Sequence, residues 1–536
     1  MKRLLTLLSA IAFAGQAWAE SFTFGNLKYT VIDSANRYVS VSKGEVELKG
    51  ELNILATATN NHTLYLVTTI DNYAFNDCGE LTSVIIPNSV TSIGNGAFNE
   101  CNSLTSVVIG DSVKSIGNYT FVGCSSLTSV TIPNSVTSIG NGAFNECNSL
   151  TSVTIGNSVT NIGDNAFYGC SKLVEINVAK DNADYYSENG VLFDVFKTTI
   201  ICYPAGKTET TYTIPNSVYY IDDYAFYGCR VLTTVTIPNP VEYIGEFAFS
   251  GCSGLTSVSI PYSVTYICQG AFSDCSSLTS VSIPESVTII DEYTFYACSS
   301  LTSVSLPNSI KWIKEGAFEG CIRLPYVTIP DSVEWIADYA FYDVVNIVYS
   351  GNAKGSPWGA YYMNPTIDTE GFIYADAEKT KLTAYIGNDT EITIPNTVRF
   401  IGYFAFYGRD SLKTVYIPNT VKDMRGSAFE GCTATIYCDF EKKPDLWDDW
   451  YVNDYKGKIV WKTATPVTET AANAVSIYAY GRSIVVENAA EEISVYDAMG
   501  RLVCRDAAHH VSTITVNGTG AYIVKVGDVV KRVVVR

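Results

Sequence analysis

Histidine is almost missing from this sequence, which has His62, His509 and His510 as its only three in 536 residues. Histidine is the side chain that most readily acts as a general base near neutral pH or as a metal ligand. The sequence also lacks the G-x-S-x-G, H-E-x-x-H, P-loop and G-x-G-x-x-G patterns. It has no C-x-x-C pair or Cys/His cluster that would suit zinc. These absences argue against an enzyme, and we expect no cofactor and no metal site.

Basic residues are also few, with 35 lysines and arginines against 54 aspartates and glutamates and a formal charge of −19. A chain of this charge repels phosphate backbones and anionic lipid. Nucleic acid is therefore excluded as an expected partner. Hydrophobic residues nevertheless make up 47% of the chain, so a large core must be buried.

Long apolar runs are confined to the N-terminus. Lys2 and Arg3 precede an apolar stretch from Leu4 to Gly15, and Ala17-Trp18-Ala19 is a small-x-small cleavage site. This pattern is typical of a secretory signal peptide, predicted here over residues 1–19. No later run approaches the roughly 18 residues that a membrane-spanning helix needs. We expect an exported chain without an integral membrane segment after cleavage.

A repeat of 23 residues dominates the rest of the sequence. One unit reads L-x-x-V-x-I-P-x-S-V-x-x-I-G-x-x-A-F-x-x-C, in which the alternating apolar residues predict a short strand and proline ends it. A fixed period of this length predicts a solenoid in which each copy is one turn and like residues stack on like. The anchoring phenylalanines are Phe75, Phe98, Phe121, Phe144, Phe167, Phe226, Phe249, Phe272, Phe295, Phe318, Phe341, Phe406 and Phe429.

The repeat resembles a known family. Its L-x-x-V-x-I core resembles the leucine-rich repeat, and the 23-residue period with IPxSVxxIGxxAFxxC is similar to the BspA-like branch of bacterial surface proteins. The resemblance runs from about Ile70 to Cys432. It departs from the general leucine-rich pattern because cysteine follows the phenylalanine and no Asn or Cys follows the strand. The resemblance implies adhesion to host proteins or to other cells.

Two interruptions and two caps complete the predicted solenoid, which spans residues 70–432. The interruptions near 171–213 and 343–393 hold similar passages, GVLFDVFKTTIICYP and GFIYADAEKTKLTAYIG. Both predict a β-hairpin inserted as an elongated turn. Residues 20–69 and 433–465 are predicted to cover the two ends, because an open solenoid end exposes a strand edge.

The C-terminal region has a different pattern. After a Thr/Ala-rich linker at 466–474, short alternating strands fill residues 475–536, and Val526-Gly527-Asp528-Val529 fits a two-residue hairpin turn. These strands predict a small β-sandwich. VYDAMGRLV, GAYIVKV and the closing VVKRVVVR resemble the C-terminal sorting domain of type IX secretion. That resemblance implies contact with export machinery, passage across the outer membrane, and a cell-surface or secreted location.

Eleven of the fifteen cysteines lie three residues after an anchoring phenylalanine. In-register stacking would place their Cα atoms about 5 Å apart, within disulfide range. Parallel Cβ vectors, however, do not suit the disulfide dihedral of about 90°, and free cysteine is a good small buried residue. The pattern favours an internal ladder of free thiols over disulfide bridges.

The candidate binding residues precede the isoleucine of each SVxxI. Ser92, Ser115, Ser138 and Asn161 hold this position in the first turns. Aromatic residues hold it later, and because it lies between inward-facing residues they should form an exposed stripe suited to protein or glycan. A structural aromatic ladder, or a face covered by the inserts, is the alternative. The proposed binding residues are Tyr220, Tyr243, Tyr266, Trp312, Trp335 and Phe400, with Ile289 between them.

Two other parts of the sequence are candidate surfaces. The Thr-Ser pairs of the first strands, such as Thr82-Ser83 and Thr256-Ser257, form neutral hydroxyl rows that suit weak binding or solubility. DLWDDW at 445–450 mixes acids with Trp447 and Trp450 as some sugar sites do, although a capping segment is the simpler interpretation. The sequence as a whole favours a non-catalytic, extracellular solenoid that binds a macromolecule. A glycan-binding accessory protein that uses the aromatic stripe is the second hypothesis, and an acidic enzyme site near the inserts or Trp447 is the third.

Overall fold

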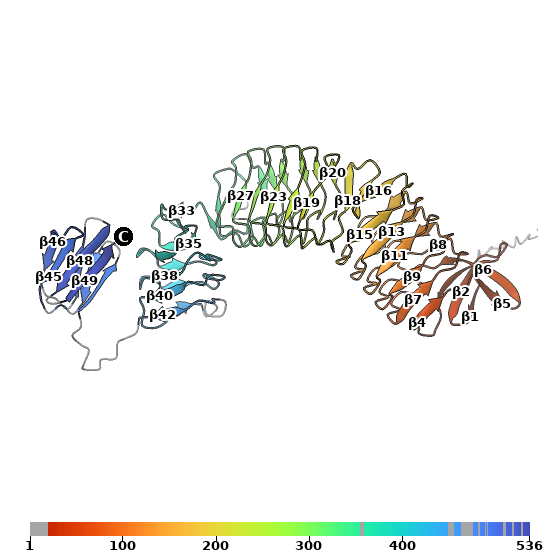
Figure 1. Cartoon of the computed structure of the whole chain (residues 1–536), viewed down its shortest axis with the longest axis horizontal. Helices are drawn as coiled ribbons and strands as arrows, with labels where there is room; N and C mark the ends of the chain where they lie inside the picture. The colour runs from red at the N-terminus through yellow and green to blue at the C-terminus, as the bar shows by residue number, and fades with distance from the viewer. Residues whose placement is uncertain are drawn as a thin grey trace, which may run out of the picture. The chain divides into compact units, whose positions relative to one another are not determined.

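The computed structural model describes residues 20–353, 358–448, 455–462, 475–480, 483–487, 489, 491–507, 511–516, 519–526 and 529–535. It divides into one unit that ends at Val460 and a second that begins at Trp461. Every regular element in the described ranges is a β-strand (Figure 1). The predicted signal peptide, the linker and the Gly527-Asp528 turn lie outside the described residues.

The first column of strands comes from the L-x-x-V-x-I segment of each turn. Its valine and isoleucine face the core, as Val130 and Ile132 do, while the residues between them face solvent. Neighbouring strands pair in parallel and in register, so that Val130 lies opposite Val153. The strands are β4 (Gly50–Asn53), β7 (Leu81–Ile85), β9 (Ser106–Val108), β11 (Ser129–Ile132), β13 (Ser152–Ile155), β15 (Glu175–Val178), β19 (Thr211–Thr213), β21 (Thr234–Thr236), β23 (Ser257–Ser259), β25 (Ser280–Ser282), β27 (Ser303–Ser305), β29 (Val327–Thr328), β31 (Asn346–Val348), β32 (Tyr362–Met363), β36 (Glu391–Thr393), β38 (Thr414–Ile417), β40 (Thr435–Cys438) and β42 (Ile459–Trp461).

The second column comes from the end of each SVxxI segment, where most strands are only two residues long. The isoleucine is buried and the residue before it faces outward, as in Tyr266-Ile267. The strands are β3 (Tyr38–Lys43), β6 (Thr63–Ile70), β8 (Ser92–Ile93), β10 (Ser115–Ile116), β12 (Ser138–Ile139), β14 (Asn161–Ile162), β18 (Thr199–Cys202), β20 (Tyr220–Ile221), β22 (Tyr243–Ile244), β24 (Tyr266–Ile267), β26 (Ile289–Ile290), β28 (Trp312–Ile313), β30 (Trp335–Ile336), β35 (Lys381–Tyr385), β37 (Phe400–Ile401), β39 (Asp423–Met424) and β41 (Leu446–Trp447).

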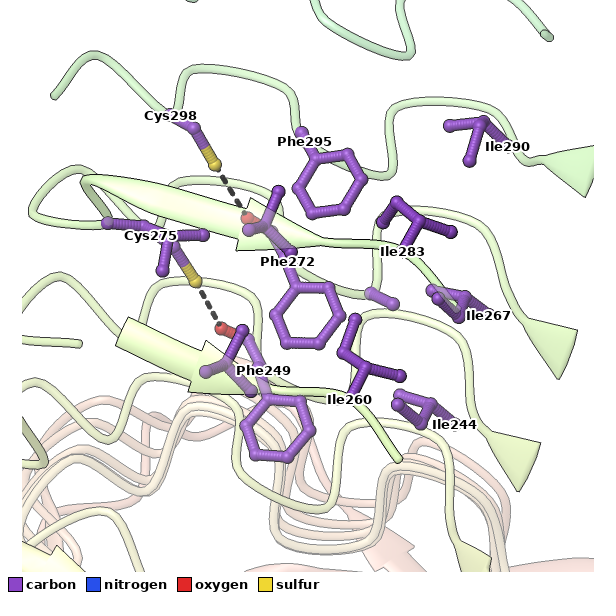
Figure 2. Packing of buried hydrophobic residues seen from close by; sticks show 14 of the residues in the cluster. Ile244, Phe249, Ile260, Ile267, Phe272, Cys275, Ile283, Ile290, Phe295 and Cys298 are labelled. Carbon is purple, nitrogen blue, oxygen red and sulfur yellow. Dashed lines mark hydrogen bonds between the residues drawn. The ribbon is translucent and has the colours of Figure 1, made fainter. Parts of the chain in front are cut away.

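The phenylalanine segment closes each turn without a strand, yet it also forms a ladder. The amide of Phe249 donates to the carbonyl of Ala271 at 2.8 Å, and that of Phe272 to Thr294 at 2.9 Å. The rings stack, with centroids 5.2 Å apart and planes 1° apart for Phe249 and Phe272 (Figure 2). Within each run of turns the core is therefore a file of stacked rings flanked by isoleucines, as near-identical repeats require. The prediction of a mainly β solenoid is confirmed.

The two interruptions contain more of the coil than two plain hairpins. Tyr203 donates its amide to Ala225 and stacks on Phe226 at 5.2 Å, which is the position of an anchoring phenylalanine. Tyr385 holds the same position against Ala405 and Phe406. The number of turns with an aromatic ring at the anchoring phenylalanine position therefore rises from thirteen to fifteen. The antiparallel strands that precede them are β16 (Tyr185–Glu188) and β17 (Val191–Asp194), then β33 (Thr366–Ile367) and β34 (Phe372–Tyr374).

At the N-terminal end, antiparallel strands extend the sheet of the second column. Besides β3 and β6, they are β1 (Ser21–Phe24), β2 (Leu27–Asp33) and β5 (Thr57–Asn60). β1 pairs with β2 and β2 with β3, so the second column runs directly into this hairpin. Tyr29, Val39 and Val41 are buried beneath it. The strand edge of the first turn is thereby paired rather than open.

The second unit has two antiparallel sheets around one small core. Ile484 and Val486 from one sheet and Val495 and Val524 from the other are fully buried in it. One sheet is β43 (Ser476–Tyr480), β44 (Ser483–Glu487) and β47 (Val511–Thr515); the other is β46 (Leu502–Asp506), β45 (Ile493–Asp497), β48 (Gly520–Val526) and β49 (Val529–Val535). Its core is separate from the repeat core.

Candidate binding surface

The proposed stripe begins with three tyrosines on one ladder. Tyr220 lies opposite Tyr243, and Tyr243 opposite Tyr266, in β20, β22 and β24. Their ring centroids are 6.3 and 6.4 Å apart. Tyr220 is 48% exposed and Tyr266 64%, whereas Tyr243 between them is half-buried. The structure therefore places these three residues in one outward row.

Two tryptophans continue the same position on a second ladder. Trp312 in β28 lies opposite Ile289 in β26 on one side and Trp335 in β30 on the other. The indoles are 47% and 51% exposed, and the isoleucine is half-buried. No ladder joins β24 to β26, so the stripe consists of a tyrosine group and a tryptophan group.

Phe400 does not lie with the other predicted residues. It sits in β37 of a different sheet, between Lys381 and Asp423. The Arg425 guanidinium lies 5.5 Å from its ring centre, and the ring is half-buried. Its ladder neighbours are charged, so Phe400 is a single ring and not part of a row. Below, "aromatic stripe" means Tyr220, Tyr243, Tyr266, Trp312 and Trp335.

The first turns present hydroxyl groups at the stripe position. Ser92 and Ser115 lie opposite one another with their hydroxyl oxygens 3.3 Å apart, and Ser138 follows in register. The change from small polar to large aromatic residues coincides with the first insert, after which Thr199 pairs with Tyr220. The coil thus carries two different outward surfaces on the same strand column.

A second aromatic row lies two residues before the anchoring phenylalanines, and sequence reasoning missed it. These residues have φ near +55°, where bulky side chains are rare. Tyr293 lies over Gly316, because a Cβ added there would meet the ring at 2.4 Å. Phe247 lies over Gly270 in the same way. The recurring YAF, FAF and YTF triplets carried this signal. The row consists of Tyr73, Tyr119, Tyr224, Phe247, Tyr293, Tyr339 and Phe404.

The threonine hydroxyls of the first strand column form hydrogen bonds within the fold. Thr105 donates its hydroxyl to the carbonyl of Thr82 at 2.9 Å, one turn earlier. Thr256, Thr279 and Thr302 donate in the same way. Threonine here stabilises the stacking of turns, which leaves fewer free donors for a ligand.

The described part of DLWDDW, residues 445–448, continues the second strand column. The Trp447 side chain is buried, with 2% of its surface exposed, and its strand β41 pairs with β39. Trp447 therefore packs in the solenoid and offers no platform to a sugar. Trp450 lies outside the described residues. Within the part of the chain that the structure describes, no group of three His, Cys, Asp or Glu residues could hold a metal ion.

All fifteen cysteines are free thiols. Cys275 donates its Sγ–H to the carbonyl of Phe249 at 3.2 Å, and Cys298 to Phe272 at the same distance (Figure 2). This confirms the internal ladder favoured from the sequence. Nine thiols of the ladder, from Cys101 to Cys321, are small buried donors that each satisfy a carbonyl of the preceding turn.

The buried thiols predict a fall in stability at alkaline pH. Burial raises the pKa of Cys147 to about 12, well above its value in an unfolded chain. Between pH 9 and pH 12 the folded state keeps protons that the unfolded state loses. Each such thiol therefore lowers the free energy of unfolding by up to about 1.4 kcal/mol per pH unit. We expect little change between pH 7 and 8 and a steep fall above pH 9, measured by guanidinium unfolding.

A matched variant isolates the thiols from other alkaline effects. Cys147→Ala with Cys275→Ala should reduce the slope above pH 9, because two of the protons at issue are gone. The native chain should also resist alkylation at pH 8 and become reactive in guanidinium. Rapid alkylation of the native chain, or stability unchanged up to pH 10.5, would contradict the buried ladder.

Comparison with known proteins identifies the repeat. The sequence pattern described as the BspA type leucine rich repeat region matches in six copies, over residues 68–188, 205–299, 288–350 and 384–451. These segments together cover more than half of the chain. No curated protein matches the chain. Within the described residues, no helix is long and apolar enough to cross a membrane.

Several solved bacterial structures are similar to parts of the chain. A leucine-rich cell surface protein of Faecalibacterium prausnitzii is 29% identical, with a TM-score of 0.42, over 57% of this chain and 93% of its own. A leucine-rich repeat protein of Bacteroides ovatus is 27% identical, with a TM-score of 0.43, over 82% and 100%. One from Eubacterium ventriosum is 26% identical, with a TM-score of 0.45, over 61% and 95%.

Proposed function

The chain belongs to the BspA-type leucine-rich repeat family, and on this premise we propose that it binds a macromolecular partner outside the cell. Leucine-rich repeat solenoids are typically non-catalytic scaffolds. The observation that carries the proposal is the aromatic stripe, in which Tyr220, Tyr266, Trp312 and Trp335 are each about half exposed or more. Adhesion to host proteins or to other cells is the role proposed for it.

The stripe suits binding for a physical reason. Tyrosine and tryptophan give large contact areas at a small cost in side-chain entropy, and they dominate the energy of many interfaces. A stacked column repeats the same contact from turn to turn, so that weak interactions add up. A structural ladder would bury its rings, as the phenylalanine column does, with Phe249 and Phe272 fully inaccessible. The stripe leaves most of its rings in water.

The proposed address is the outer surface of a bacterium or the medium around it. The pattern of residues 1–19 supports export. The similarity of the second unit's motifs to type IX sorting domains supports a role in passage across the outer membrane. GAYIVKV is strand β48, which pairs antiparallel with the closing strand β49. Export machinery is accordingly the partner proposed for this unit.

A glycan is the second candidate ligand for the same residues. Trp312 and Trp335 are exposed neighbours on adjacent turns, and exposed indoles can stack on sugar rings. A neutral polysaccharide would need no charge on the protein. A protein ligand and a neutral glycan ligand therefore differ in whether they need charged residues beside the stripe.

The test is a binding panel with the mature chain. The chain is immobilised and exposed to extracellular matrix proteins and to soluble cell-wall and plant polysaccharides, and retention is measured by surface plasmon resonance. We expect saturable binding to at least one macromolecule, without chemical change to it. Absence of binding across the whole panel, or turnover of a bound polymer by the purified chain, would contradict the proposal.

A further inference from the structure

A column of acidic residues runs beside the aromatic stripe. It lies three residues after each stripe position, and Asp223, Glu246, Glu315 and Asp338 are exposed there while Glu292 is half-buried. Gln269 takes the position in the turn of Tyr266. In the first turns the same position holds amides, Asn72, Asn95, Asn118 and Asn141. Asp164 already holds this position in the last turn before the first insert, and aromatic residues replace the small polar ones at the stripe position after it. From Tyr220 to Asp338 the aromatic and acidic positions lie in the same turns, so they belong to one surface.

The acidic column lies between the stripe and the second aromatic row. The amide of Tyr224 donates to the carbonyl of Glu246 at 2.9 Å, and that of Tyr293 to Glu315 at 2.9 Å. Glu246 and Glu315 are thus the ladder neighbours of rings of the second row, whereas Glu292 accepts the amide of Gly270. Burial raises the pKa of the Tyr293 hydroxyl, and the carboxylates of Glu315, Glu319 and Glu292 raise it further. Carboxylates therefore stand among aromatic rings on both sides.

Few cations oppose these acids. Residues 216–343 contain fourteen aspartates and glutamates and four lysines and arginines. Lys311 pairs with Glu334 at 3.4 Å, and Lys314 with Asp291 at 2.9 Å. The hydrogen bond to Asp291 raises the pKa of Lys314 and the carboxylate of Glu292 raises it further, so this one lysine offsets part of the charge of the column. Arg323 donates to the carbonyl of Gly408. The surface around the stripe keeps an excess of negative charge.

Stacked like charges weaken the fold that carries them. Neighbouring turns of a parallel ladder lie about 4.8 Å apart, and like charges directly opposite one another across strands are destabilising. The asparagines of the first turns avoid this repulsion. Asn95 Oδ1 accepts the amide of Asn118 at 2.8 Å, and Asp223 Oδ1 accepts the amide of Glu246 at 2.7 Å in the same way, so charge is the difference between the two sets. The stacked acids therefore lower the stability of the fold, and a bound cation would relieve their repulsion.

We propose that the aromatic stripe and the acidic column together bind a basic protein segment that presents lysine or arginine at short intervals. The proposal rests on the proposed function and names the class of its partner. A guanidinium can lie on a tyrosine or tryptophan face while it bonds a carboxylate one row away. A neutral glycan gains nothing from the charge, and an acidic one is repelled. The observed chemistry favours the basic protein over the sugar.

The test uses a fluorescent twelve-residue oligo-arginine peptide and the mature chain. Anisotropy titrations at 50 and 300 mM salt should show binding that weakens at least tenfold at the higher salt, because exposed charges are screened. The triple variant Glu246→Gln, Glu292→Gln, Glu315→Gln should bind at least tenfold more weakly at low salt. The control Asp111→Asn, Glu175→Gln, Glu391→Gln removes the same charge from other exposed sites and should bind almost as the natural chain does.

The outcomes separate this inference from the proposed function. Equal loss in the two triple variants would mean that only net charge matters, and it would overturn the inference. If the binding panel finds a partner whose affinity depends on the stripe but is the same in the Glu→Gln variant and at both salt concentrations, the proposed function stands and the basic-partner inference fails. Retention of a neutral polysaccharide together with no oligo-arginine binding would also overturn the inference.

Discussion

Replacing Phe272 by alanine should lower the free energy of unfolding by about 3–5 kcal/mol. The ring is completely buried, and its neighbours Phe249 and Phe295 stack on it at 5.2 and 5.7 Å. Removing it opens a cavity in the middle of the column and ends two ring contacts. The surrounding turns cannot close the gap, because their backbone ladders fix the spacing. Guanidinium unfolding followed by circular dichroism measures the loss.

The change should also be local. In a repeat protein each turn contacts only its neighbours, so hydrogen exchange should rise most around residues 249–295 and little in the first turns. Tyr262→Ala is the matched control, because that ring is 75% exposed and its loss should stay within about 0.5 kcal/mol. A loss below about 1 kcal/mol for Phe272→Ala would contradict the column as the main source of stability.

The coil could be predicted from sequence because it repeats. Phenylalanine, proline and the alternating valine and isoleucine recur at a fixed spacing, so one turn identifies the environment of the others. Tyr203 and Tyr385 were missed because each fills the phenylalanine position after a shorter segment between the second-column strand and the ring. From Ile221 to Phe226 is five residues, whereas from Ile200 to Tyr203 is three. The hydrogen bonds to Ala225 and Ala405 and the ring contacts with Phe226 and Phe406 reveal the shared position.

The stripe was predictable in position but not in continuity. An outward residue before a buried isoleucine follows from strand alternation, and Tyr220, Tyr266, Trp312 and Trp335 are exposed there. The sequence could not show that the ladder stops between β24 and β26, nor that Phe400 faces charged neighbours on another sheet. Such breaks depend on small shifts between turns, which no residue pattern records.

The second aromatic row escaped prediction for a different reason. Tyrosine and phenylalanine rarely adopt φ near +55°, so YAF and FAF triplets were not recognised as left-handed positions. The glycines one turn later make the arrangement possible, because their missing Cβ leaves room for the ring. The pairing of Phe247 with Gly270 is a long-range feature, 23 residues apart, that the ladder alone brings together.

Four substitutions test the stripe itself. Tyr243, Tyr266, Trp312 and Trp335 are each replaced by serine, the residue that the first turns carry at this position. Binding of the partner retained in the panel should fall at least 100-fold, because interface aromatics often contribute about 2 kcal/mol or more each. The melting temperature should move by no more than about 2 °C, since three of the four rings are about half exposed or more and none belongs to the buried phenylalanine column.

A control variant removes exposed tyrosines from another part of the surface. Tyr416→Ser with Tyr437→Ser takes away a stacked pair whose rings are 39% and 40% exposed and whose strands belong to the first column. It should bind the partner as the natural chain does. The deciding measurement is the dissociation constant of the four-serine variant beside its melting temperature. Lost binding with unchanged melting is the predicted result, and retained binding with a collapsed melting temperature would contradict the account.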